Sequence, residues 1–177
     1  MSRSFQNRGI NTNLTSLSYR PAIGIVVVNA RDQVLIGRRN DMVDQWQFPQ
    51  GGIDPDESPS GAALRELTEE TGICQGSVEI LGFTQQYIKY DYPSSVIQEL
   101  NVKKTWRYAG QQLQFFLLRY HGSDESIDVQ NVPNPEFDAW KWVDYWEPLR
   151  LIVEFKHDLY HRALTELAPY LRLAVNP

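Results

Sequence analysis

Three carboxylates are crowded into five consecutive residues of the segment GGIDPDESPSGAALRELTEETGI (51–73). If this segment is a helix, Glu66, Glu69 and Glu70 fall within an arc of about 100°, because each residue turns the helix by about 100°. Like charges at these spacings repel one another. A hard divalent cation such as Mg²⁺ takes oxygen ligands and would turn that repulsion into attraction. The spacing therefore indicates either a metal site or a solvated charged face, and for a lone pair of acids the second is commoner.

The elements that must position these carboxylates follow from the hydrophobic pattern. Six segments have the β-branched, aromatic or alternating composition of strands: PAIGIVVVN (21–29), QVLIGRR (33–39), WQFPQGGI (46–53), SVEILGFTQQYIKYDYP (77–93), GQQLQFFLLRYHG (110–122) and DAWKWVDYW (138–146). The first two are predicted to form a hairpin. In the third, one proline and two glycines predict a sharp turn beside something that the backbone approaches closely.

Two helical regions are predicted. One begins at Pro59, with Ser58 or Ser60 at its start, and ends at Thr71 and Gly72. The other runs from about Pro148 to Leu173 with a break near Phe155. Strands interleaved with helices predict an α/β fold with a mixed β-sheet sandwiched between α-helices.

The composition of the 177-residue chain, with 42% hydrophobic and 22% charged residues, is that of one globular domain. We expect a polar N-terminal tail (1–18), a single domain (19–170) and a C-terminal tail (171–177). Without a run of about 18 apolar residues, no membrane span is expected. The single Cys74 excludes an internal disulfide and predicts a reducing cytoplasm. The net charge of −5 argues against a protein that coats DNA or RNA non-specifically.

The frame around the carboxylates resembles the signature of the Nudix hydrolase family, G-x5-E-x7-R-E-U-x-E-E-x-G-U, where U is aliphatic. The matching residues are Gly51, Glu57, Arg65, Glu66, Leu67, Glu69, Glu70, Gly72 and Ile73. At residue frequencies of about 6%, the seven fixed letters match by chance with a probability on the order of 10⁻⁹ per start position. Members of this family hydrolyse nucleoside diphosphates linked to another group. The resemblance therefore implies a Nudix fold and metal-assisted attack of water on a phosphoanhydride.

The resemblance also implies roles for the signature residues. Glu66, Glu69 and Glu70 would be metal ligands, and one of them would act as the base for the attacking water or lie close to it. The expected cofactor is Mg²⁺, with Mn²⁺ or another divalent cation as a substitute. A backbone carbonyl of Gln50 or Gly51 would face the metal. Glu57 would pair with Arg65 and orient it, and Gly72 would cap the helix.

Further segments, such as YRPAIGIVVVN, WQFPQGGI, PEFDAWKWV and YWEPLRLIVEFKHDLYHRAL, extend the resemblance over roughly residues 19 to 168. They are similar to the subgroup that contains bacterial RNA 5′-pyrophosphohydrolases and asymmetrically cleaving dinucleoside polyphosphate hydrolases. By that resemblance, Glu136 would be a metal ligand or base from outside the signature. Arg20 and Arg39 would contact the phosphates or the 5′ end of the substrate. A nucleobase pocket would be formed by Tyr87, Val153, Phe155 and Lys156.

Three features depart from the subgroup's pattern. The segment NDMVDQ (40–45) carries two acids, which is not typical of a phosphate-binding loop. Gln112 and Leu113 stand where relatives often have Lys and Gln. Glu154 places an acid beside the expected base pocket. These departures bear on substrate preference and not on the reaction.

Three functions are compatible with these residues. The first is removal of pyrophosphate from 5′-triphosphorylated RNA, and the second is hydrolysis of diadenosine tetraphosphate and its relatives to ATP plus a second nucleotide. The third, a catalytically silent nucleotide-binding module, fits less well because every signature carboxylate is present. We expect a cytoplasmic monomer that binds neither membrane nor DNA.

Other motifs have more ordinary interpretations. HDLYH (157–161) resembles the HExxH zinc motif only weakly, because it lacks an evident third ligand. Trp140, Trp142, Tyr145 and Trp146 are interpreted as core residues, with base stacking as the alternative. Lys103, Lys104 and Arg107 either steer an RNA chain or form a solvated patch.

Overall fold

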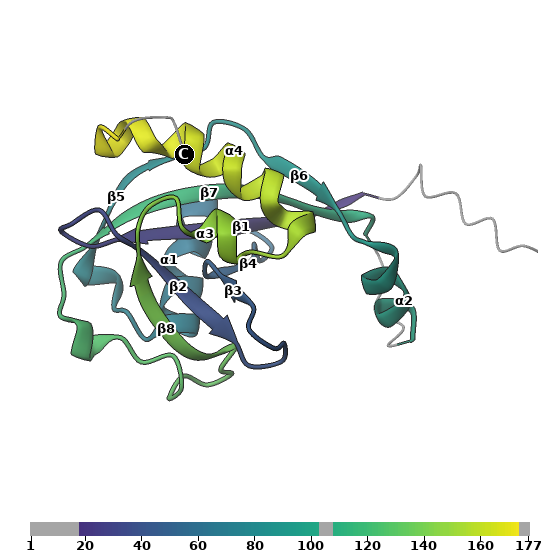
Figure 1. The fold of residues 1–177 in the computed structure, drawn as a ribbon, viewed down its shortest axis with the longest axis horizontal. Helices are drawn as coiled ribbons and strands as arrows, with labels where there is room; N and C mark the ends of the chain where they lie inside the picture. The colour runs from purple at the N-terminus through teal and green to yellow at the C-terminus, as the bar shows by residue number, and fades with distance from the viewer. Residues whose placement is uncertain (1–17, 103–107, 174–177) are drawn as a thin grey trace, which may run out of the picture.

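In the computed structural model, which describes residues 18–102 and 108–173, eight strands of the described chain form one mixed sheet (Figure 1). The strands are β1 (Tyr19–Val28), β2 (Val34–Arg39), β3 (Trp46–Gln47), β4 (Gln50–Gly52), β5 (Val78–Phe83), β6 (Ile88–Asp91), β7 (Gly110–Tyr120) and β8 (Phe137–Val143). The order along the main path is β3-β2-β1-β7-β5, while β4 pairs with β1, β6 with β7 and β8 with β2.

Strand β1 organises the sheet. It runs parallel to β7 over its whole length, from Tyr19 opposite Gly110 to Val28 opposite Arg119. Its pairing with β2 is limited to Val28 opposite Val34, so the predicted hairpin is confirmed only at its turn. On the edge that is not paired with β7, the first half of β1 pairs with β4, from Ala22 opposite Gly52 to Gly24 opposite Gln50. This pairing fixes the start of the signature segment to the centre of the sheet.

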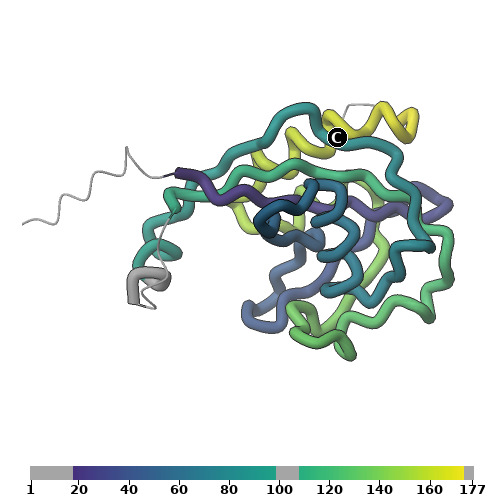
Figure 2. Tube along the Cα trace, turned by 180° about the vertical axis from the view of Figure 1, so that it is seen from behind, coloured from purple at the N-terminus to yellow at the C-terminus, as the bar shows by residue number. Residues whose placement is uncertain are grey.

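Helices cover both faces of the sheet, as predicted. Helix α1 (Pro59–Thr71) lies on one face, and α3 (Pro148–Leu151) and α4 (His157–Leu167) lie on the other. Figure 1 shows α4 in front of the strands. Figure 2, which views the molecule from the opposite side, shows α1 in front of them. Helix α2 (Ser94–Val102) projects beyond the sheet. Short 3-10 turns complete the described elements: η2 (Gln75–Ser77), η3 (Asp124–Ser126), η4 (Glu154–Lys156) and η5 (Ala168–Leu171).

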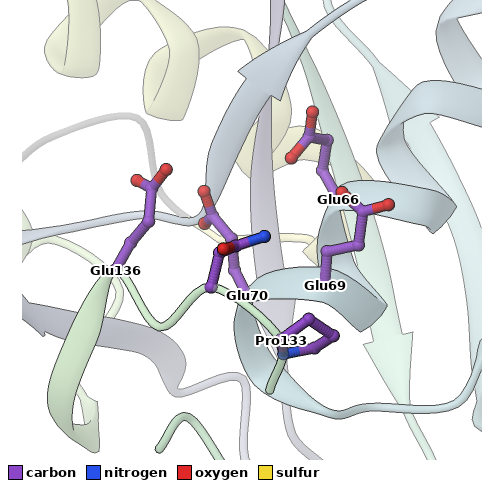
Figure 3. Close-up of a pocket in the computed structure, with 6 residues that line it drawn as sticks. Glu66, Glu69, Glu70, Pro133 and Glu136 are labelled. Carbon is purple, nitrogen blue, oxygen red and sulfur yellow. The ribbon is translucent and has the colours of Figure 1, made fainter.

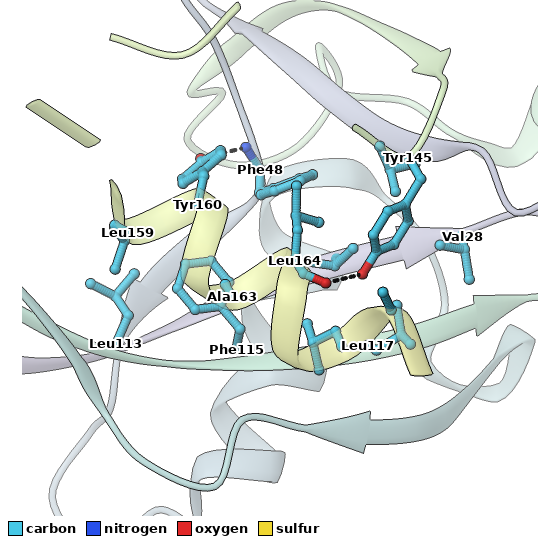
Figure 4. Packing of buried hydrophobic residues seen from close by; sticks show 14 of the residues in the cluster. Val28, Phe48, Leu113, Phe115, Leu117, Tyr145, Leu159, Tyr160, Ala163 and Leu164 are labelled. Carbon is cyan, nitrogen blue, oxygen red and sulfur yellow. Dashed lines mark hydrogen bonds between the residues drawn. The ribbon is translucent and has the colours of Figure 1, made fainter. Parts of the chain in front are cut away.

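The unbroken apolar run of β1 is buried on both faces because alternate side chains of a strand point to opposite sides. Ile23, Ile25 and Val27 pack with Leu67 of α1. Val26 and Val28 pack in the cluster that α4 covers, part of which Figure 4 shows. The tryptophans and tyrosine of DAWKWVDYW pack against these two cores, in agreement with their interpretation as core residues.

Helix α1 begins and ends where the sequence predicts. The hydroxyl of Ser58 accepts a hydrogen bond from the Gly61 N–H at 3.1 Å, which caps the first turn. Gly72 ends the helix in the left-handed conformation, with φ of 70°. These two local signals set the position of the three carboxylates along the chain.

The predicted long strand over residues 77–93 is wrong, because the structure divides it into β5 and β6. Between them, Thr84 exchanges two hydrogen bonds with Phe115: its N–H donates to the Phe115 carbonyl and its hydroxyl accepts from the Phe115 N–H. A register shift between Ile80 and Gly82 also bends the chain. Helix α2 was not predicted either.

Several predictions concern the ends of the chain and one loop. Residues 1–17 and 174–177, and with them most of the expected tails, lie outside the described residues, as do Lys103, Lys104 and Arg107. Leu171 is buried and Leu173 packs against the α4-side core, so packing continues past the expected boundary at residue 170. Among the helices of the described chain, none is long and apolar enough to cross a bilayer.

Tyr160 generates a test of the α4-side core. Its ring is fully buried and its hydroxyl accepts a hydrogen bond from the Phe48 N–H at 2.9 Å (Figure 4). Tyr160→Phe should lower the free energy of unfolding by about 1–3 kcal/mol, because a buried N–H loses its partner. Denaturant unfolding measures this change. Tyr170→Phe, at an exposed ring, is the control, and equal stability of both variants would contradict the assignment.

Candidate active site

Four carboxylates meet at one cavity of about 310 Å³. Glu66, Glu69 and Glu70 reach it from α1, and Glu136 reaches it from the loop before β8. Pro133 and Asn134 complete the lining. Figure 3 shows the four acidic side chains gathered around this space. The structure therefore brings together the signature acids and the one acid that was predicted from outside the signature.

Glu70 is the most enclosed of the four. Its side chain is 3% exposed, and its Oε2 accepts a hydrogen bond from the Gln50 N–H at 3.1 Å. Its Oε1 is buried and has no hydrogen-bond partner among the described residues. Burial and then the charge of Glu136 raise the pKa of Glu70 well above its ordinary value. A positive ligand next to Oε1 would remove both penalties.

Arg65 compensates the other acids of α1. Its guanidinium donates to both oxygens of Glu57, at 2.9 and 2.8 Å, so the predicted pair is present. It also donates to Glu66 at 2.8 Å, to Glu69 at 3.2 Å and to the Gly52 carbonyl at 3.0 Å. These hydrogen bonds lower the pKa of Glu57. The pKa of Glu66 is still raised, because burial outweighs the contact with Arg65.

The two glycines of β4 are required by close approach. A Cβ atom on Gly51 would overlap the carboxyl group of Glu66. A Cβ atom on Gly52 would lie 2.6 Å from Nη2 of Arg20, whose exposed side chain lies against that backbone. Neither glycine has a positive φ, and the segment is interrupted before them, between β3 and β4. The predicted close approach is confirmed.

A second cluster, which we call the lysine pocket, consists of Gln47, Gln50, Tyr90, Phe155 and Lys156. The Lys156 amine is buried and lies 3.4 Å from Oε1 of Gln47 and 3.3 Å from Oε1 of Gln50. It also lies 5.8 Å from the centre of the Tyr90 ring. Burial, and then the charge of Arg39, lower the pKa of Lys156 to about 8. Phe155 is 41% exposed, so its ring faces solvent at the edge of this cluster.

Tyr90, which the sequence analysis did not single out, lies beside Phe155 in this cluster. The Tyr90 ring lies 6.0 Å from that of Phe155, and its hydroxyl donates to Oε1 of Gln111 at 2.8 Å. Tyr87 precedes β6 and has no ring contact with Phe155 among the described contacts. Val153 is half-buried next to the pocket, and its carbonyl accepts from the Lys156 N–H at 2.9 Å. Strand alternation, which puts Ile88 and Tyr90 on one face, is the signal that could have identified Tyr90.

Gln50 joins the two clusters. Its backbone N–H donates to Glu70, and its side-chain oxygen accepts from Lys156. The acidic cavity and the lysine pocket are therefore neighbours, separated by a single residue of β4. A molecule with an aromatic base attached to phosphates could occupy both.

The residues of the acidic cavity fit a divalent cation in their chemistry. Its four carboxylates supply oxygen ligands, and Oε1 of Glu70, which is buried without a hydrogen-bond partner among the described residues, is the atom best placed to bind a positive ligand. In the described part of the chain, however, no three His, Cys, Asp or Glu side chains already stand in a metal-ligating arrangement. Because Arg65 holds Glu66 and Glu69, binding would require these carboxylates to exchange part of that contact for the cation. The ring centres of His157 and His161 lie 6.4 Å apart, and within the described part of the chain no third His, Cys, Asp or Glu completes a metal site with them.

Comparisons with known proteins agree with this geometry. A model of the NUDIX domain matches residues 18–165. Proteins named RNA pyrophosphohydrolase from Proteus mirabilis (strain HI4320) and Saccharophagus degradans are 44% and 42% identical over 151 residues. These matches cover 85% of this chain and 84% and 86% of the relatives.

Solved structures share the fold. The E. coli dihydroneopterin triphosphate pyrophosphohydrolase has a TM-score of 0.60 at 21% identity, covering 82% of this chain and 96% of that chain. A C. elegans Ap4A hydrolase binary complex has a TM-score of 0.56 at 18% identity, covering 80% and 93%.

Gly51 provides a test of the acidic cavity. Gly51→Ala should displace the Glu66 carboxylate and weaken Mn²⁺ binding by about 10–100-fold, as is typical when a supporting contact of a metal ligand is lost. The melting temperature should change little, because the displaced group is the end of a flexible side chain. Titration calorimetry measures the affinity. Gly76→Ala is the control, since nothing in the described structure lies within 4 Å of its Cβ position. Unchanged Mn²⁺ affinity in Gly51→Ala would contradict the assignment.

Proposed function

The chain belongs to the Nudix family and is a Nudix hydrolase, and from that premise we propose that it removes pyrophosphate from the 5′-triphosphate end of RNA. The observation that carries this proposal is the junction at Gln50, which places an aromatic and cationic pocket directly beside the acidic cavity. The two relatives named RNA pyrophosphohydrolase, matched over most of both chains, support the same substrate.

The lysine pocket is proposed to hold a nucleobase of the RNA. The exposed ring of Phe155 and the ring of Tyr90 offer stacking surfaces, and stacking of this kind contributes about 1–3 kcal/mol per base. The Lys156 amine can donate a hydrogen bond to an acceptor on the base edge. Its present acceptors, at 3.3 and 3.4 Å, are at the long end of hydrogen-bond distances, so a base could compete with them.

Nudix hydrolases use divalent cations, and we propose Mg²⁺, with Mn²⁺ as a substitute. Glu66, Glu69, Glu70 and Glu136 would hold the cation, with a carbonyl of Gln50 or Gly51 nearby. When bound, it supplies the positive charge that neutralises carboxylates and phosphates together. Glu70 must be ionised to act as a ligand, so cation binding should release protons at pH values below its raised pKa.

In the proposed reaction, water adds to a phosphorus atom of the triphosphate, the phosphoanhydride P–O bond breaks, and pyrophosphate leaves. Glu70 or Glu136 takes the proton of the attacking water. Arg20 and Arg39 bind the phosphates. Arg65 acts as a positioning residue, because its donors are used by Glu57, Glu66, Glu69 and the Gly52 carbonyl.

Hydrolysis of dinucleoside polyphosphates is the second candidate function. It requires room for a second nucleoside, and an open cavity of about 370 Å³ lined by Arg38 to Asp44 and Asp138 offers it. The complete set of carboxylates argues against a silent nucleotide-binding module.

We propose that the enzyme works in the cytoplasm, where transcripts carry 5′-triphosphates. The two relatives that are named RNA pyrophosphohydrolase are bacterial.

A direct substrate comparison tests this function. With Mg²⁺, kcat/KM for a short 5′-triphosphate RNA should exceed that for diadenosine tetraphosphate by at least about tenfold, because only the RNA offers neighbouring nucleotides to the lysine pocket. Product analysis should find 5′-monophosphate RNA and pyrophosphate or sequentially released phosphate. A preference for the dinucleotide, with ATP and AMP as products, would establish the second function instead.

The Glu70→Gln variant tests the chemistry. Turnover should fall at least about 100-fold, because a ligand and candidate base becomes neutral. The melting temperature in chelator should stay equal or rise, because the amide removes a charge that burial disfavours and can still accept from the Gln50 N–H. Glu79→Gln, at an exposed residue of β5, is the control. Near-normal turnover of Glu70→Gln with Mg²⁺ would refute the metal assignment.

A further inference from the structure

Arg39, the last residue of β2, lies at an irregularity of the sheet, where it pairs with Phe137, the neighbour of Glu136. The pairing of β2 with β8 shifts register between Arg38 and Arg39, and such bulges re-aim neighbouring side chains. Arg38 pairs with Asp138 at 2.7 Å. Arg39 is half-buried, and the hydrogen bonds that it donates to Asp41, followed by the charges of Asp41, Glu136 and Glu70, raise its pKa. It is thus a fixed positive charge beside the proposed reaction site.

The guanidinium fork of Arg39 is occupied by a carboxylate of the same chain. Its Nε donates to Oδ1 of Asp41 at 2.7 Å, and its Nη2 donates to Oδ2 at 2.6 Å. Two parallel hydrogen bonds of this kind are also the geometry with which arginine binds phosphate. Asp41 therefore holds the same donors that a substrate phosphate would need.

The loop around Asp41 (40–45) is held in place by backbone contacts. The Arg39 N–H donates to the Gln45 carbonyl at 2.8 Å and closes the loop. The Asn40 N–H donates to the Glu136 carbonyl at 3.0 Å, and the Asn40 amide donates to the Pro135 carbonyl. Asp41 is therefore presented to Arg39 by a loop that is tied to the segment carrying Glu136.

We propose that Asp41 is a specificity-determining residue that competes with substrate phosphate for Arg39; this inference rests on the proposed function. Displacing Asp41 costs every ligand the same ion pair with Arg39. A triphosphate, with its larger negative charge, displaces Asp41 and bears this whole cost. A 5′-monophosphate that leaves Asp41 in place loses only its own weaker contact with Arg39. Asp41 thus weakens binding of the triphosphate RNA more than binding of the product.

The test compares Asp41→Asn with Asp44→Asn in the full-length protein. Asp44 lies on the same loop with φ of 52°, a conformation that asparagine adopts readily, so this control removes one charge without strain. For Asp41→Asn, KM for 5′-triphosphate RNA should fall about fivefold, the scale of a partly exposed ion pair, and the inhibition constant of 5′-monophosphate RNA should fall about twofold. The kcat should not rise. Asp44→Asn should change each value less than twofold.

A double-mutant cycle with Arg39→Gln separates competition for the fork from a general charge effect. In the Arg39→Gln background, Asp41→Asn should change neither constant. An equal effect in both backgrounds would overturn the proposal, and so would a raised KM for Asp41→Asn, because Asp41 would then orient Arg39 for the substrate.

Binding of inorganic tripolyphosphate, measured by calorimetry in chelator, makes the test independent of RNA hydrolysis. Asp41→Asn should bind this probe several-fold more tightly than the wild type, and Asp44→Asn should not. If the wild type failed to hydrolyse triphosphate RNA while this difference held, the proposed function would fall and the role of Asp41 would stand. If hydrolysis held and this difference were missing, the role of Asp41 would fall alone.

Discussion

Repulsion among carboxylates is the constraint on which the rest of this structure depends. Three glutamates of α1 and Glu136 share one cavity, and one guanidinium, that of Arg65, compensates Glu66 and Glu69. Glu57 in turn holds Arg65 through two hydrogen bonds. Among the described residues, Glu70 accepts one hydrogen bond, from the Gln50 N–H, and it is the most buried of the four. The buried carboxylate that most needs positive charge therefore lies at the junction with the lysine pocket.

Four carboxylates stay close together only when rigid elements hold them, because mobile carboxylates would move apart. The support comes from packing at the centre of the molecule. Ala62, Ala63 and Leu67 bury one side of α1 against the sheet, where they contact the cluster of Ile23 and Ile25. On the facing strand, Gly51 leaves space for the Glu66 carboxyl group. Small residues thus bring the acidic side of α1 close to β4, and the same strand supplies the N–H that Glu70 accepts.

The predictable parts of this arrangement are those encoded by neighbours in sequence. Ser58 and Gly72 fix the ends of α1, and the spacing of Glu66, Glu69 and Glu70 on one side follows from helix geometry alone. Glu136 has no such local signal, and only the family resemblance identified it. The pairing of β1 with β4 is a contact between distant segments, which hydrophobic patterns do not specify. Tyr90 was missed because residues 77–93 were assigned to one strand. In the structure, the chain leaves the strand geometry at Thr84, so the side of the sheet on which each β6 residue lies does not follow from β5. The helix start at Pro93 and Ser94 was hidden by the same assignment.

The residues proposed for the chemistry and those proposed for substrate choice lie in structurally different parts of the molecule. The acids of α1 belong to an element whose opposite side is core, so changes there disturb packing as well as charge. Arg39, Asp41 and Phe155 lie at the end of β2, in the following loop and in the short turn η4, and none belongs to either core cluster. They can therefore change without disturbing the packing of these clusters. Gln50 is the exception, since its backbone N–H donates to Glu70 and its side-chain oxygen accepts from Lys156. Because the contact with Glu70 uses the backbone, the Gln50 side chain can be altered while that hydrogen bond stays. The side chains proposed for base recognition can therefore diverge up to the edge of the acidic cavity without removing this hydrogen bond from it.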